Sequence, residues 1–161
     1  MTDPIIAAAR RTASEAFDVL RASVKGLGAT ALNAKPAGDD TNSIAVLATH
    51  AMSATHVLLR VAVGLPELPR DRAAEFAAVA AGPEPVLATI DSLANECLAV
   101  LDGAGAVDWS AIRRRTRGDG SISEMTAAYA LLHGVDHLRG HADEASLTRH
   151  VVGGGIGLTI Q

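Results

Sequence analysis

The chain has 161 residues, of which 48% are hydrophobic but only 2% are aromatic. This length suits a single domain whose core has to be built from Ala, Leu, Val and Ile side chains, as in closely packed helices. The formal net charge of −4 argues against a general nucleic-acid-binding protein.

The first predicted helix begins at residues 3–4, because Asp is a favourable cap and Pro fits the first helical turn. An apolar stripe continues this helix to Lys25. Residues 26–41 are rich in Gly, Ala, Pro and Asp, and we expect a loop there. The second long helix starts at a capping residue within 41–43 and ends at Gly64, a natural helix end.

The second half of the chain predicts two more long helices. Residues 72–82 are expected to form a short helix, and two prolines precede a long apolar stripe that ends near residue 103. Residues 104–120 are expected to be irregular. The stretch Ser-Ile-Ser-Glu at 121–124 resembles a capping box, which predicts that the last helix runs from there to about residue 152. The remaining residues, 153–161, are expected to form a tail.

Four long helices joined by short and medium connections predict an all-α four-helix bundle over residues 1–152. No stretch outside the terminal residues alternates convincingly at a period of two, so no sheet is expected. Trp109 is expected to anchor the irregular segment on the bundle. The arginines of that segment most simply form a solvated, mobile loop, and the alternative is that they bind an anionic substrate or cofactor carboxylate: Arg113, Arg114, Arg115 and Arg117.

The single cysteine, Cys97, excludes an internal disulfide and a metal site of the CxxC type. It shares an apolar helix stripe, which predicts a core residue rather than a nucleophile. The N-terminal segment lacks the basic start and long apolar run of a signal peptide. No uncharged apolar run reaches about 18 residues, so no membrane span is expected. These features predict a cytoplasmic protein with no membrane partner.

Three histidines are arranged as metal ligands would be. His137 and His141 lie four residues apart, which rotates the second side chain by only about 40° around a helix. Such a pair presents two imidazoles to one ion. His50 lies on an apolar stripe with Leu47 and Val57 that would face the bundle interior, where facing helices share metal sites. The alternative is a hydrogen-bonded core histidine at 50 and a surface pair on the last helix.

The other histidines are expected to play lesser parts. His133 extends the row on the last helix but is rotated about 80° from His141, so we expect it to line the pocket rather than bind the same ion. His56 is expected at the surface. His150 lies near a helix C-terminus, where a partly charged imidazole is favourable.

The segments TNSIAVLATH and HLRGHADEASLTR resemble the entry to the second helix and the last-helix motif of the DinB-like (YfiT-type) superfamily. Its members are four-helix bundles that hold a divalent metal with three histidines. The resemblance implies that His50, His137 and His141 take the ligand positions. The chain departs from the family at Asp143 and Glu144, where Gly and then Gln or His are usual, and Glu144 could reach or neutralise the metal.

Characterised enzymes of this superfamily depend on thiols and include mycothiol-dependent maleylpyruvate isomerase and thiol S-transferases. The resemblance therefore implies an S-transferase or isomerase that acts on a small electrophile with a divalent metal and a low-molecular-weight thiol such as mycothiol. Imidazoles suit Zn, Ni, Fe and Cu alike, and of these we expect Zn or Ni. His133 or Glu144 would accept the thiol proton, and Arg115 or Arg117 would hold a carboxylate. Two alternatives stay open: a non-catalytic metal-binding or dimerisation bundle, and a plain interaction bundle. A homodimer is expected, because related bundles pair their helices.

Overall fold

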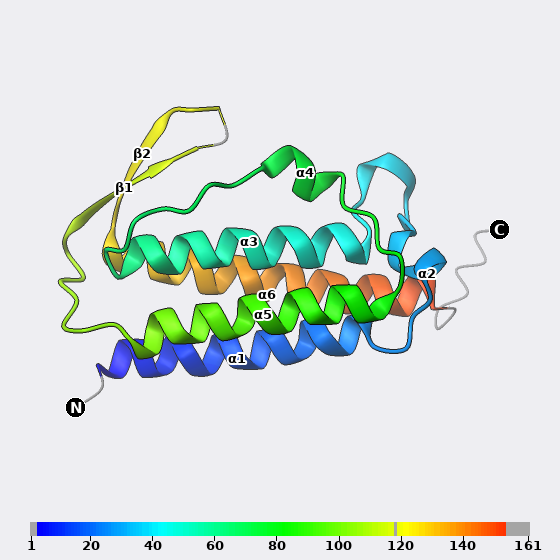
Figure 1. Cartoon of the computed structure of the whole chain (residues 1–161), viewed down its shortest axis with the longest axis horizontal. Helices are drawn as coiled ribbons and strands as arrows, with labels where there is room; N and C mark the ends of the chain where they lie inside the picture. The colour runs from blue at the N-terminus through cyan, green and yellow to red at the C-terminus, as the bar shows by residue number, and fades with distance from the viewer. Residues whose placement is uncertain (1–2, 118, 154–161) are drawn as a thin grey trace.

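Four long helices form the body of the computed structural model, which describes residues 3–117 and 119–153 (Figure 1). Each helix packs against two neighbours, in the cyclic order α1, α6, α3, α5. The predicted four-helix bundle is therefore confirmed. The four helices are α1 (Pro4–Val24), α3 (Ile44–Ala62), α5 (Pro83–Asp102) and α6 (Ala127–Val152).

Three of the four long helices, α1, α3 and α6, begin where a side chain accepts a hydrogen bond from a free amide of the first turn. The amide of Ile5 donates to Asp3 Oδ1 at 2.7 Å, and the amide of Val46 donates to Ser43 Oγ at 3.3 Å. Both starts agree with the sequence. The last helix is different, because it starts at Ala127 and not at residue 121, and its cap is Thr126.

A β-hairpin occupies the segment for which no sheet was expected. Strand β1 (Ile112–Thr116) pairs antiparallel with β2 (Ile122–Thr126). The sequence signal was an Asp-Gly turn, in which Gly120 has a φ of 80° and the hydroxyl of Ser121 donates to Asp119 Oδ1. The residues read as a capping box are therefore part of a strand. The expectation of an irregular arginine loop was wrong, since Arg113 and Arg115 are half-buried strand residues.

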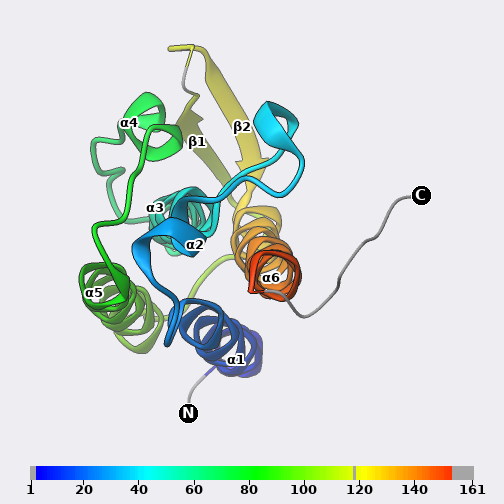
Figure 2. The same cartoon turned by 90° about the vertical axis from the view of Figure 1, so that its right-hand side faces the viewer.

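The connection between α3 and α5 runs back along the whole bundle (Figure 1). These two helices run in the same direction, so the chain must return before α5 can start. We call residues 63–82 the crossover; it contains the short helix α4 (Arg72–Phe76). Figure 2 shows the crossover and the hairpin on the same side of the bundle, over α3 and α6. Residues 26–41, expected as a loop, include the short helices α2 (Ala29–Asn33) and η1 (Gly38–Asp40).

Helix α3 is the core element of the bundle. Its residues are buried on nearly all sides, because α5, α6, the crossover and the hairpin surround it. The segment Gly38–Ala62 is long and apolar enough to cross a membrane, but 83% of its most apolar window is buried inside the protein. We therefore interpret it as the core helix of a globular domain. Trp109 holds the start of the hairpin segment to α1, as expected, by donating from Nε1 to Asp3 Oδ2 at 2.9 Å.

Gly134 sets how closely α6 approaches α3. A Cβ atom at this position would lie 3.0 Å from Leu58 Cβ and 3.5 Å from Leu59 Cδ2. Gly134→Ala is therefore expected to lower the free energy of unfolding by about 1–3 kcal/mol through overpacking. Gly140→Ala, on the open face of the same helix, should instead stabilise by roughly 0.5–1 kcal/mol. Urea unfolding of the two variants measures both changes in the free energy of unfolding. Equal changes would contradict the close approach of α6 to α3 at Gly134.

Candidate metal centre

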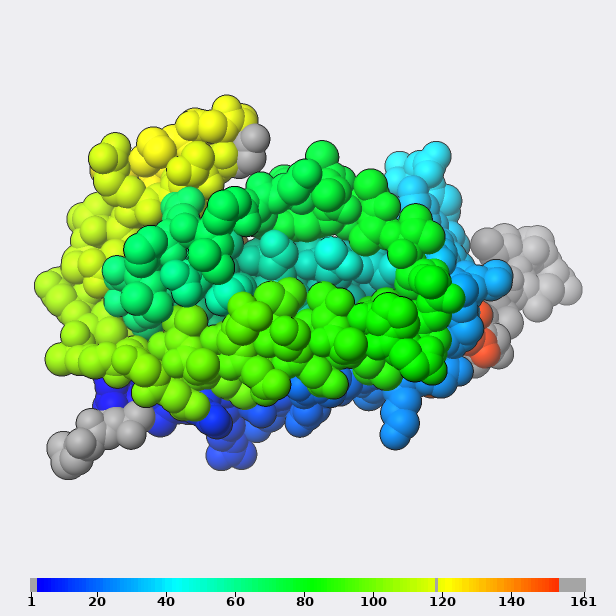
Figure 3. All heavy atoms as spheres, in the orientation of Figure 1, coloured from blue at the N-terminus to red at the C-terminus, as the bar shows by residue number. Residues whose placement is uncertain are grey.

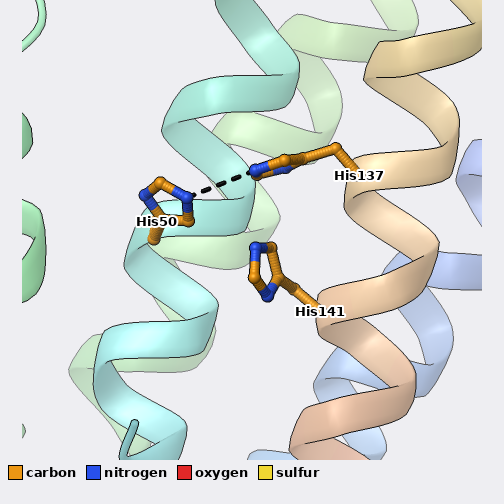
Figure 4. A group of neighbouring side chains, drawn as sticks. All are labelled: His50, His137 and His141. Carbon is orange, nitrogen blue, oxygen red and sulfur yellow. Dashed lines mark hydrogen bonds between the residues drawn. The ribbon is translucent and has the colours of Figure 1, made fainter. Parts of the chain in front are cut away.

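His50, His137 and His141 converge between α3 and α6 (Figure 4). Each offers one ligand atom, and these atoms lie within 4.8 Å of one another. Nε2 of His50 is 3.2 Å from Nε2 of His137. Nitrogen–metal distances of about 2.1 Å place two adjacent ligand nitrogens roughly 3.0–3.4 Å apart. The spacing of this pair thus fits ligands of one ion.

The electrostatics of the site favour the neutral forms of His50 and His137, and metal ligands must be neutral imidazoles. Burial and the neighbouring His141 and His50 lower the pKa of His137 to about 3. Burial also lowers the pKa of His50, although its hydrogen bond to Glu75 opposes the shift. Within the described residues, buried Nδ1 of His137 has no hydrogen-bond partner. An unsatisfied ring nitrogen argues against the alternative of a fully hydrogen-bonded core cluster.

A buried carboxylate on the crossover, Glu75, orients His50. Its Oε2 is 3.0 Å from His50 Nδ1, and its residue is only 5% exposed. Arg70 donates from Nε and Nη2 to the two oxygens of Glu75, each at 2.6 Å. Burial raises the pKa of Glu75, but the hydrogen bonds from Arg70, Ser53 and His50 outweigh that effect and lower it. Glu75 is therefore ionised at neutral pH.

The tautomer of His50 follows from these contacts. Nη2 of Arg70 also lies 3.1 Å from His50 Nδ1, so this nitrogen faces both a donor and an acceptor. We assign the proton to Nδ1, because Arg70 is already satisfied by both carboxylate oxygens and an unprotonated nitrogen would repel the carboxylate. Nε2 is then free to bind a metal. A carboxylate behind a metal-binding imidazole is a common arrangement.

Glu75 and Arg70 were not predicted as site residues. Glu75 is a single carboxylate in a five-residue helix, and only the path of the crossover brings it over His50. The one local signal was Glu75 beside Phe76, whose ring centroid lies 4.6 Å from that of His50. An apolar residue next to an acidic one suggests that this short helix packs against the rest of the protein, but it does not indicate which residues it contacts.

Glu144 is placed differently from the expectation that it could reach the metal. Its Oε2 is 3.0 Å from Nδ1 of His141, so the carboxylate lies behind the ring. Glu144 thus does for His141 what Glu75 does for His50, and it leaves Nε2 available. Asp143 pairs with Arg139 at 3.0 Å on the outer face of α6.

A cavity of about 660 Å³ opens beside the histidines, a size that fits a small ligand. His50 and His137 line it together with His133, which was expected to line a pocket. The ring centroid of His133 is 6.0 Å from that of His137, and His133 is outside the three-histidine group. Arg115 and Arg117 also line the cavity, as in the anion-binding alternative for the arginines.

The remaining histidines and the cysteine lie outside the cluster. His56 was expected at the surface, but it is only 6% exposed and its Nδ1 faces Glu96 Oε2 at 3.6 Å. That expectation was wrong, because α5 covers this side of α3. His150 is exposed near the end of α6. Cys97 is fully buried, and burial raises the pKa of its thiol to about 12, so it is a core residue as predicted.

Comparisons with known proteins agree with this architecture. The family model of the DinB superfamily matches residues 12–145. Among solved structures, the crystal structure of the conserved protein of a locus from Enterococcus faecalis superimposes with a TM-score of 0.74. The two chains are 15% identical over 96% of this chain and 99% of the other, a likeness that concerns the fold alone. No curated protein gives a match.

Proposed function

Because this chain belongs to the DinB superfamily, we propose that His50, His137 and His141 bind one divalent metal ion for a thiol-dependent reaction. The protein would act as an S-transferase or isomerase on a small electrophile. The observation that carries this proposal is the convergence of three imidazoles within 4.8 Å, two of them lining a cavity. Three protein ligands are the usual number at a catalytic rather than a structural site.

The metal we propose is Zn or Ni, since both suit imidazole ligands. Such an ion, held by three neutral histidines, keeps open positions and favours the deprotonated form of a bound thiol. The thiol has to come from outside the protein, because Cys97 is buried and its pKa is raised to about 12. By resemblance to the characterised members of the superfamily, we propose mycothiol or a similar small thiol.

The side chains around the cavity have distinct parts in this proposal. His133, at the cavity wall, would accept the proton that the thiol releases when it binds as a thiolate. Glu144 would keep His141 oriented rather than act as a base, because its carboxylate is engaged behind that ring. Arg115 and Arg117 would hold a carboxylate of the thiol or of the electrophile.

The test of activity is conjugation of mycothiol to a bimane electrophile by metal-loaded protein. We expect conjugation well above that of a metal-free His50→Ala variant. His133→Gln should lower kcat by roughly 10²-fold or more with unchanged metal content, as loss of a general base does. If metal-loaded protein and His50→Ala protein conjugate several thiols at the same rate, the bundle binds metal without catalysis.

The same bundle could serve as a non-catalytic dimerisation module, and we propose a homodimer in either case. An apolar groove of about 540 Å³ lies between α1 and α6, where Ile5 and Leu132 are 45% and 66% exposed. Pairing of two copies would cover these side chains. Residues 154–161 of the expected tail lie outside the described residues.

Light scattering at micromolar concentration tests the dimer. We expect a mass of two chains, and Leu132→Asp should convert the protein to monomer without loss of helical circular dichroism, because Leu132 is exposed. Arg139→Asp, a control that also changes a residue lining the groove but removes no apolar surface, should dimerise more strongly than Leu132→Asp. A wild-type mass of one chain would contradict the proposal.

We propose a cytoplasmic location and small molecules as the only ligands besides metal. The support is the burial of the apolar α3 helix and the single reduced cysteine. The net charge of −4 disfavours nucleic acid as a partner.

A further inference from the structure

The cavity beside the histidines collects arginines from two separate parts of the chain. Arg70 and Arg72 come from the crossover, and Arg115 and Arg117 come from the hairpin. Figure 3 shows these two segments standing next to one another on one side of the molecule. The whole chain carries a net charge of −4, so this concentration of positive charge is not a consequence of composition.

Most of this charge has no carboxylate partner within the described part of the chain. Arg70 is paired with buried Glu75. Arg72 packs over the Phe76 ring, 4.9 Å from its centroid. Glu67 is the acidic residue of the lining, and its Oε1 accepts a hydrogen bond from the Thr116 amide at 2.8 Å. Four arginines and one carboxylate line the cavity, so its lining carries a net positive charge even with Arg70 paired to Glu75.

Arg115 is the arginine whose position calls most strongly for an anion. It is half-buried, and burial together with the charge of Arg70 lowers its pKa. A guanidinium taken from water among other cations is unfavourable unless an anion neutralises it. Among the described residues, Arg117 at the cavity rim donates from Nη2 to the neutral hydroxyl of Ser123, at 3.3 Å. Both side chains thus have donors left for a ligand.

The period of the strand separates these two arginines from their neighbour. Successive side chains of a strand point to opposite faces. Arg115 therefore faces the cavity, whereas Arg114 points outward, where it is 70% exposed and lies 3.5 Å from Glu124. Arg114 is a matched control, since it has the same charge on the same strand but lies outside the cavity.

We infer that this cavity binds a small dianion, either a dicarboxylate or a phosphate group, through Arg115, Arg117 and Arg72. The ligand compensates the net positive charge of the lining, and planar guanidinium groups match the oxygens of both anions. The inference rests on the proposed function in one respect only: it takes the dianionic group to be part of the substrate that reaches the histidines. Binding of the anion itself needs no metal, because the arginines supply the charge.

Isothermal titration of the full chain tests the inference with three probes at one ionic strength: succinate, inorganic phosphate and the monoanion butyrate. We expect succinate or phosphate to bind clearly more tightly than butyrate, and the stronger of the two identifies the anion. Arg115→Gln and Arg117→Gln should each weaken that binding by about tenfold or more, because each removes a charged hydrogen bond. Arg114→Gln should leave it unchanged.

The metal-free His137→Ala variant separates this inference from the proposed function. Dianion binding that persists there supports the arginine site, whatever the outcome of the thiol assay. If the dianion does not bind to metal-free His137→Ala protein but still binds to Arg115→Gln protein, the anion binds to the metal, and the inference is overturned. Equal weakening by Arg114→Gln, equal affinity for butyrate, or no saturable binding up to about 10 mM would also overturn it. Arg115→Lys, which keeps the charge, should bind more tightly than Arg115→Gln if both fold.

Discussion

Purified His137→Ala protein is expected to contain no stoichiometric divalent metal, whereas we expect one ion per chain in the wild type. His137 is one of the three proposed ligands, and its ring centroid lies 5.0 Å from that of His50 and 4.5 Å from that of His141. Removing one of three imidazoles leaves two, too few to hold an ion against dilution and chelators. Elemental analysis of protein purified without an affinity tag measures the difference.

The matched control is His150→Ala, which removes an exposed imidazole from the same helix. It should retain the metal. The metal-free protein should keep its helical circular dichroism, because the apolar core of α1, α3, α5 and α6 does not depend on the ion. Equal metal content in the two variants would contradict the ligand assignment, and loss of helix on chelation would show a structural ion.

Glu75→Ala is expected to cost both stability and metal affinity. The substitution leaves Arg70, whose side chain is 13% exposed, without its partner at the surface of α3. Loss of one partner of a buried ion pair costs about 3–5 kcal/mol, which urea unfolding of metal-free protein would measure. His50 also loses the carboxylate that orients it, so metal affinity should fall by about 10–100-fold.

Glu144→Ala provides the comparison, because Glu144 supports His141 from an exposed position. Its side chain is 44% exposed, so the free energy of unfolding should change by less than about 1 kcal/mol. Metal affinity should still fall. If Glu75→Ala and Glu144→Ala lower the free energy of unfolding equally, or if neither lowers the metal affinity, the two carboxylates do not orient the histidines as proposed.

The sequence predicted those parts of the protein that depend on local pattern. Asp3 and Ser43 cap their helices as expected, and the spacing of His137 and His141 placed them on one face of α6. His50 could be assigned to the same cluster because it lies on an apolar stripe of α3. These features follow from helical periodicity, which needs no knowledge of distant residues.

The parts that the sequence did not predict depend on chain path. Glu75 meets His50 only because the crossover returns along α3, and His56 is buried because α5 covers it. The hairpin was missed since its strands are five residues each and its alternating residues are arginines, not apolar side chains. Its Asp-Gly turn was the available signal, and the apparent capping box at 121–124 competed with it.

Helix α4 has a dynamic consequence that follows from its length. Five residues are too few to form a stable helix in isolation, so α4 persists only while its side chains are docked. Its anchors are the contacts of Glu75 and Phe76 with His50. Amide hydrogens of α4 therefore exchange with solvent through local opening, at a rate governed by how firmly His50 is held. Hydrogen exchange at these few amides would therefore report whether the proposed metal site is occupied. It can be measured on the wild-type protein, without any substitution.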